Sequence, residues 1–177
     1  MALNRVLLEG VLTADTRKII NDNFADVSRV TTAFSQATST ALADVVGLVT
    51  GTLQPGTYFV DINLITTAGA SGGLKAALKW GTASMITATS LSVRAFSAAA
   101  VAATTFTTST DAASIVAATS AYVNVQIKGT ITVALAGTLQ LQAAQNASDA
   151  TATTVALGST MRFVPIGATT PLSSAII

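Results

Sequence analysis

The strict alternation of apolar and polar residues in the last third of the chain constrains the fold most. Leu139, Leu141 and Ala143 alternate with Gln140 and Gln142. A period of two residues is typical of a β-strand that buries one face and exposes the other. A Ser/Thr/Ala/Asn stretch interrupts the pattern, and a second extended segment follows it. We therefore expect a β-hairpin whose polar face carries amides and hydroxyls in place of charges.

Composition indicates how such a β-protein copes with water. Charged residues make up 10% of the chain, hydrophobic residues 50%, and the formal net charge is +1, whereas a typical soluble domain has roughly 25% charged residues. A subunit with so few charges is expected to cover its sides with copies of itself or with a partner. The sequence has no apolar run of the ~18 residues that a membrane span needs, and no basic cluster with interleaved aromatic residues. We expect neither a membrane nor a nucleic acid as partner.

The residue types needed for catalysis or metal binding are scarce. The chain has no Cys and no His, which excludes thiol nucleophiles, disulfides, His/Cys zinc sites and His-dependent triads. A glycosidase needs two facing carboxylates, and nothing in the pattern brings Asp61, Asp111 and Asp149 together. Asn146, Ser148 and Asp149 carry oxygens that calcium would accept, but a polar turn is the simpler interpretation. We expect no enzyme activity and no cofactor.

The N-terminal part of the chain has a different character. Residues 1–46 hold more charged residues than all the rest. Core-type positions recur there at spacings of four and three, at Ile20, Phe24, Val27, Thr31 and Phe34. This spacing predicts an amphipathic helix, which either lies on its own domain or docks on a partner.

Beyond residue 51 the pattern becomes extended. A Pro-Gly turn signal precedes Tyr58–Ile65, whose alternation places Tyr58, Val60, Ile62 and Leu64 on one face. Gly69–Gly73 predicts a flexible loop at a tip. Further strands are expected at Leu74–Trp80, at Leu91–Phe96, near 104–107 and 114–117, and within 121–135. About eight strands without intervening helices predict an antiparallel sandwich, and eight strands in two sheets is the jelly-roll count.

Two C-terminal segments, Gly137–Asn146 and Ala156–Phe163, resemble the end of the tumour-necrosis-factor/complement-like jelly rolls of tailed-phage virion proteins. These include capsid decoration (cement) proteins, head fibres and tail appendages. Upstream, Pro55–Val60 resembles the first strand of such a domain and Tyr122–Gly129 a central one, so that the resemblance covers roughly residues 51–167. It implies an all-β, antiparallel, eight-stranded jelly-roll sandwich that forms a homotrimer, with an N-terminal segment that attaches the trimer to the virion.

From this resemblance we expect a structural virion protein on the capsid surface: a homotrimeric decoration protein that binds the major capsid protein and stabilises the shell. The expected domains are a helical attachment arm over 1–50, a jelly-roll trimerisation domain over 51–167 and a C-terminal tail over 168–177. The expected capsid-attachment residues are Arg17, Ile20, Phe24, Val27 and Phe34. The expected trimer-interface residues are Tyr122, Val125, Leu139, Leu141, Ala143 and Phe163.

The alternative is a head- or tail-fibre module that binds host-surface glycan. In that hypothesis Trp80, Tyr58 and Tyr122 form a sugar platform and the Gly69–Gly73 loop forms part of the tip. Aromatic residues in a β-sandwich lie more often in the core or in an interface, which favours the decoration protein.

Overall fold

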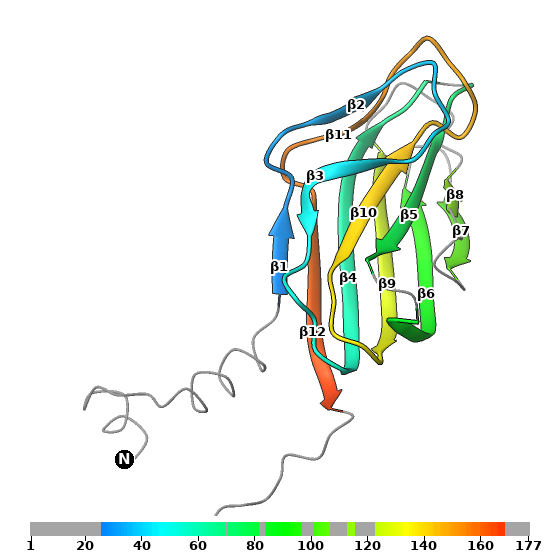
Figure 1. Ribbon diagram of the computed structural model, residues 1–177. Helices are drawn as coiled ribbons and strands as arrows, with labels where there is room; N and C mark the ends of the chain where they lie inside the picture. Colours follow the sequence, from blue (N-terminus) through cyan, green and yellow to red (C-terminus); the bar gives the residue numbers. More distant parts are fainter. Residues whose placement is uncertain are drawn as a thin grey trace, which may run out of the picture.

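The described part of the chain is an all-β sandwich. The computed structural model describes residues 26–69, 71–81, 84–96, 101–106, 113–115 and 123–168. Their strands form two antiparallel sheets that lie face to face, with no helix in these ranges (Figure 1). The antiparallel β-sandwich expected from the sequence is confirmed. Within the same ranges, no helix of membrane-spanning length and apolarity occurs.

The larger sheet, sheet A, contains eight strands. They are β1 (Asp26–Arg29), β2 (Phe34–Gln36), β4 (Gly56–Thr67), β6 (Ile86–Phe96), β7 (Val101–Phe106), β9 (Val123–Val133), β11 (Thr153–Val155) and β12 (Thr160–Ala168). Six of them follow one another in the order β1-β12-β4-β9-β6-β7, and β11 pairs with both β2 and β4. The longest ladder joins β4 to β9, so these two strands form the middle of the sheet.

The smaller sheet, sheet B, contains four strands in the order β3-β10-β5-β8. Their bounds are β3 (Ala43–Val49), β5 (Leu74–Trp80), β8 (Ala113–Ile115) and β10 (Leu139–Ala144). The expected hairpin between β10 and the segment that follows it is wrong, because β10 pairs with β3 and β5 while β11 and β12 belong to sheet A. The polar stretch between β10 and β11 crosses from one sheet to the other, and alternation alone does not tell a hairpin from such a crossing.

The alternating residues bury the faces that the sequence predicted. Tyr58, Val60, Ile62 and Leu64 of β4 all point into the core, while the residues between them are half-buried. Sheet B contributes the apolar residues of β3, β5 and β10 to the same core. The largest fully buried side chains are those of Phe163, Leu48, Ile62, Leu64, Leu74, Met85, Ile127, Leu139, Leu141, Met161 and Gln145. The two inner faces therefore cover each other, as in other packed sandwiches.

The expected helical arm over residues 1–50 is wrong for the part that the structure describes. β1, β2 and β3 lie within residues 26–49, and each pairs with a strand of the sandwich. Val27 is on β1 and Phe34 on β2, so the three- and four-residue spacing arises from two short strands, of four and three residues, and the loop between them. The rest of the expected arm and the tail beyond residue 168 lie outside the described residues.

The two sheets come together at the edge formed by β1 and β3. Gly47 of β3 has φ +90°, and a Cβ atom there would lie 2.2 Å from the carbonyl oxygen of Arg29 in β1. Close by, the backbone N–H of Gly51 donates to Oδ2 of Asp26 at 2.6 Å. Only glycine combines this backbone angle with so close an approach. The edge of the sandwich is therefore closed by β3 lying against β1.

Candidate interaction surfaces

Five of the six residues expected at a trimer interface are buried inside their own chain. Val125, Leu139, Leu141, Ala143 and Phe163 are between 0% and 1% exposed. Their assignment to an interface is wrong, because the other sheet already covers the face on which they lie. A period-two pattern identifies a buried face but does not say which surface buries it. The sixth residue, Tyr122, lies outside the described residues.

Of the expected capsid-attachment residues, the structure describes two. Val27 is 61% exposed on β1 and is available to a partner. Phe34 is partly buried against the core from β2, where it pairs with Val155, so it supports the sandwich. Arg17, Ile20 and Phe24 lie outside the described residues.

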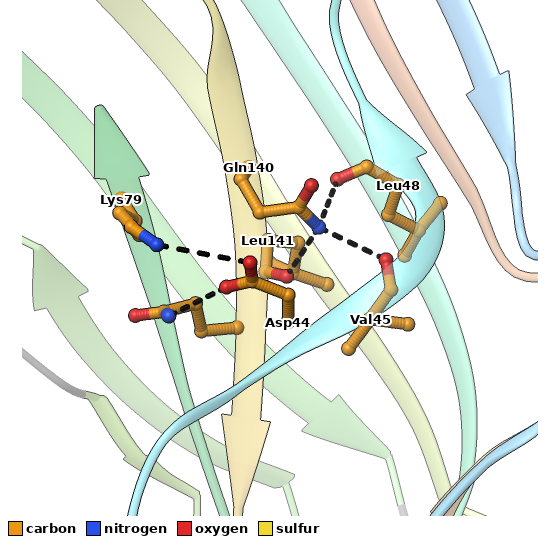
Figure 2. A network of polar contacts seen from close by, with 7 residues as sticks. Asp44, Val45, Leu48, Lys79, Gln140 and Leu141 are labelled. Carbon is orange, nitrogen blue, oxygen red and sulfur yellow. Dashed lines mark hydrogen bonds and ion pairs between the residues drawn. The ribbon is translucent and has the colours of Figure 1, made fainter. Parts of the chain in front are cut away.

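The outer face of sheet B is tied together by an amide. Between residues 44 and 49, β3 bulges away from β10, which frees carbonyl groups from the regular ladder. The Nε2 group of Gln140 donates to the carbonyl oxygens of Val45 at 2.9 Å and Leu48 at 3.1 Å, and lies 2.9 Å from that of Leu141 (Figure 2). Gln140 thus satisfies carbonyls that the bulge would otherwise leave unpaired.

The charges on this face are also used within the chain. Nε2 of Gln142 donates to Oδ1 of Asp44 at 2.6 Å, and Nζ of Lys79 lies 3.7 Å from Oδ2 of the same carboxylate (Figure 2). These residues come from β10, β3 and β5, so they connect three neighbouring strands of sheet B. These three polar side chains of the outer face of sheet B therefore interact with one another.

The polar turn after β10 is closed by the buried side chain of Gln145. Its Oε1 accepts from the backbone N–H of Asp149 at 3.1 Å, and its Nε2 donates to the carbonyl oxygens of Asp149 at 3.0 Å and Thr151 at 2.8 Å. The backbone N–H of Thr38, in the loop between β2 and β3, donates to the Asp149 carbonyl at 2.9 Å. These two loops lie together at one end of the sandwich (Figure 1).

The Asp149 carboxylate is held by main-chain groups. The backbone N–H of Thr151 donates to its Oδ1 at 2.8 Å. This bond lowers the pKa of Asp149 from its ordinary value of 3.8; partial desolvation opposes the shift, and the N–H groups of Ser71 and Gly72 reinforce it. The interpretation as a polar turn is confirmed. Among the described residues, no group of three or more carboxylates lies close enough to hold a metal ion.

The glycine-rich loop after β4 is packed under Asp149. A Cβ atom at Gly69 would lie 2.7 Å from Oδ2 of Asp149, and one at Gly72 would lie 2.9 Å from its Cβ. Gly69, Gly72 and Gly73 are buried. The loop lies at an end of the sandwich, as predicted, but its glycines do not form an open surface for a glycan.

The aromatic residues proposed for a sugar platform are also engaged internally. Tyr58 is buried, and its hydroxyl donates to the carbonyl oxygen of Gln54 at 2.8 Å. Trp80 packs against the core from β5. The gap that Trp80 lines with Ile86 and Leu139 has a volume of about 10 Å³, whereas small-molecule sites measure about 300–1,000 Å³. These aromatics were expected in the core or in an interface; Tyr58 lies in the core, and Trp80 is partly buried against it.

The outer face of sheet A carries a set of cations that the sequence analysis missed. Register places Arg162 opposite Asp61, and Asp61 opposite Lys128. One row further along the strands, Arg29 of β1 and Arg94 of β6 stand at the two ends of a cross-strand row. We call Arg29, Arg94, Lys128 and Arg162 the basic face. The signal was available for Arg94 and Arg162, because each of these arginines lies between two buried apolar neighbours.

Most of this basic face has no acidic partner within the described part of the chain. Lys128 lies 3.6 Å from Oδ1 of Asp61, and Nδ2 of Asn63 donates to the same oxygen at 3.1 Å. None of the arginines of the basic face forms an ion pair with a described residue. Asp61 is thus already shared between a lysine and an amide.

Exposed apolar side chains gather on the edge where the sheets meet. Val27 of β1 and Val46 and Val49 of β3 are 61%, 59% and 41% exposed. We call these three residues the valine edge.

Comparison of the chain with protein-family models and with curated protein sequences found no match.

Proposed function

We propose that this chain is a structural, non-enzymatic protein of a tailed-phage virion, a homotrimeric decoration protein that binds the outer capsid shell. The observation that carries the proposal is the order of the strands in the two sheets. The function is inferred from the resemblance of residues 51–167 to virion jelly rolls, and the strand order supports that resemblance.

The strand order supports a jelly roll extended by a hairpin. With β2, β6, β7 and β11 set aside, sheet A runs β1-β12-β4-β9 and sheet B runs β3-β10-β5-β8. The chain changes sheet on passing from β3 to β4, from β4 to β5, from β8 to β9 and from β9 to β10. Strands that are distant in sequence therefore become neighbours in both sheets. Eight such strands in two sheets are typical of a jelly roll.

The exposed apolar residues support association of identical subunits. Five of the residues that the sequence predicted at a trimer interface are buried in the core. The valine edge is therefore the strongest apolar candidate for a contact between copies. A chain with 10% charged residues has little ionic surface to keep such an edge solvated. Contacts of this kind close into a ring when they are repeated around a threefold axis.

The test is the molar mass in solution, measured by light scattering. We expect three times the chain mass of 17.8 kDa, and we expect Val46→Asp to give the single-chain mass, because burying an unpaired carboxylate in an interface is costly. Ala147→Asp, at the far end of the sandwich, is the control and should keep the trimer. A single-chain mass for the unaltered protein would contradict the trimer.

The location is tested by cryo-electron microscopy of virions that carry the chain. We expect density for the sandwich on the outer surface of the head, at threefold or quasi-threefold positions. Density confined to the tail would contradict the decoration role and would favour the fibre hypothesis.

A further inference from the structure

The basic face makes the outer side of sheet A the most positively charged part of the described molecule. Its four cations surround a single carboxylate, Asp61, on the outer side of sheet A. The remaining described charges are Lys75 and Lys79 with Asp26, Asp44 and Asp149. Positive charge is therefore concentrated on one flat side, although the net charge of the whole chain is only +1.

The neutral residues between the cations are suited to contact with protein. The row from Arg29 to Arg94 passes through the uncharged polar side chains of Thr160, Asn63 and Gln126. Its ends are four strand spacings apart, or about 19 Å. The adjacent outer positions include Phe59, Ile65 and Val164, which are half-buried apolar residues. A surface that combines arginines with amides, hydroxyls and apolar side chains is typical of a protein–protein interface.

We infer that the basic face docks on an acidic protein surface, with its arginines binding carboxylate side chains of the partner; if the proposed function holds, that partner is the capsid shell. A guanidinium group pairs with a carboxylate through two parallel hydrogen bonds, and the described chain leaves the arginines free to do so.

Two other occupants fit less well. A second copy of this chain would bring the same cations together across the contact, which is unfavourable. A nucleic acid would place phosphates next to Asp61, in the middle of the face, and the arginine row is interrupted by three neutral residues. Charge complementarity therefore favours an acidic protein.

The experiment measures binding of the full chain to fluorescently labelled poly-L-glutamate. Arg94→Gln/Arg162→Gln removes two charges from the basic face, and the matched control Lys75→Gln/Lys79→Gln removes two from sheet B. We expect the arginine variant to weaken binding about fivefold, since each exposed charge contact contributes modestly, and the lysine variant to change it less than twofold. Arg94→Gln alone changes an exposed side chain, should give about a twofold loss, and serves as the variant least able to disturb folding. Binding should weaken as salt rises from about 50 to about 300 mM.

Three outcomes would overturn the inference. The first is an equal effect of the arginine and lysine variants. The second is tighter binding to double-stranded DNA than to poly-L-glutamate, with the same arginine dependence. The third is a lower oligomer mass for the arginine variant, which would identify a second copy as the occupant. A single-chain mass for the unaltered protein would refute the proposed trimer while leaving this charge test valid, so the two failures are distinguishable.

Discussion

The outer faces of the two sheets show two uses of polar residues on similar strands. On sheet B, Gln140 bonds to the carbonyls freed by the β3 bulge, and Asp44 binds both Gln142 and Lys79. On sheet A, the arginines of the basic face form no ion pair with the described residues. On sheet B the polar side chains therefore bind groups of their own chain, whereas on sheet A the three arginines have no acidic partner among the described residues. The position of a polar residue in an alternating strand does not reveal which of these uses it has.

The largest expected effect comes from deforming sheet A itself. Gly129 of β9 has φ +150°, and a Cβ atom there would lie 1.9 Å from the carbonyl oxygen of Ser90 in β6. Gly129→Ala should lower the free energy of unfolding by about 3 kcal/mol or more, because the backbone is strained and β6 must move. In the control Gly81→Ala, the nearest atom to the new Cβ is 4.0 Å away. Chemical denaturation of both variants tests this, and equal stabilities would contradict it.

A second comparison sets one glutamine from each face against the other. Gln140→Ala should cost about 2 kcal/mol, because the carbonyls of Val45 and Leu48 lose their donor. Gln126 of β9 is also half-buried on an outer face, and its side chain forms no hydrogen bond with the described residues. Gln126→Ala should therefore cost less than about 0.5 kcal/mol. If urea denaturation finds the two costs equal, the contrast between the faces is wrong.

A smaller, pH-dependent effect is expected at the end loops. The pKa of Asp149 is lower in the folded chain than its ordinary value of 3.8, chiefly because the Thr151 N–H donates to it. Its contribution to stability is therefore present above about pH 4 and is lost as the pH falls through the folded pKa. Asp149→Asn should be less stable than the unaltered chain at pH 7, and the difference should shrink in acid. Melting temperatures measured from pH 7 down to pH 3 test this, and a constant difference would refute it.

Small effects are also expected from the two ion pairs formed among the described residues, one on each face. Lys79 and Asp44 have half-exposed side chains, whereas only 23% of the Asp61 side chain is exposed beside Lys128. Lys79→Gln and Lys128→Gln should each cost less than about 1 kcal/mol, with the larger loss for Lys128→Gln because its partner is better shielded from water. Thermal denaturation of both variants at low and high salt tests this. A larger loss of stability for Lys79→Gln than for Lys128→Gln would contradict it.

Periodicity predicted much of the sandwich. The strand expected at Leu74–Trp80 has the same bounds in the structure, and the four core residues expected on β4 are all buried. It failed at β1 and β2, where short strands and the loop between them reproduce a helical spacing. A strand of three or four residues is too short for its own alternation to outweigh such a coincidence.

The interaction surfaces were harder to predict than the strands. The residues expected at a trimer interface were the most regular alternating ones, and for that reason they lie in the core. The basic face was overlooked because its residues are scattered between positions 29 and 162 and become neighbours only through strand pairing.

Local chemistry settles which side chains of a strand face inward, because successive residues point to opposite sides of the backbone. That information is present in any short stretch of this chain. Pairing is different: β10 lies between β3 and β5, which come from far earlier in the chain, and no local pattern specifies those partners. Folding the chain assembles contacts between distant segments. Those contacts determine whether an outward polar group, such as Gln140 or Arg94, meets its own backbone or stays free for another molecule.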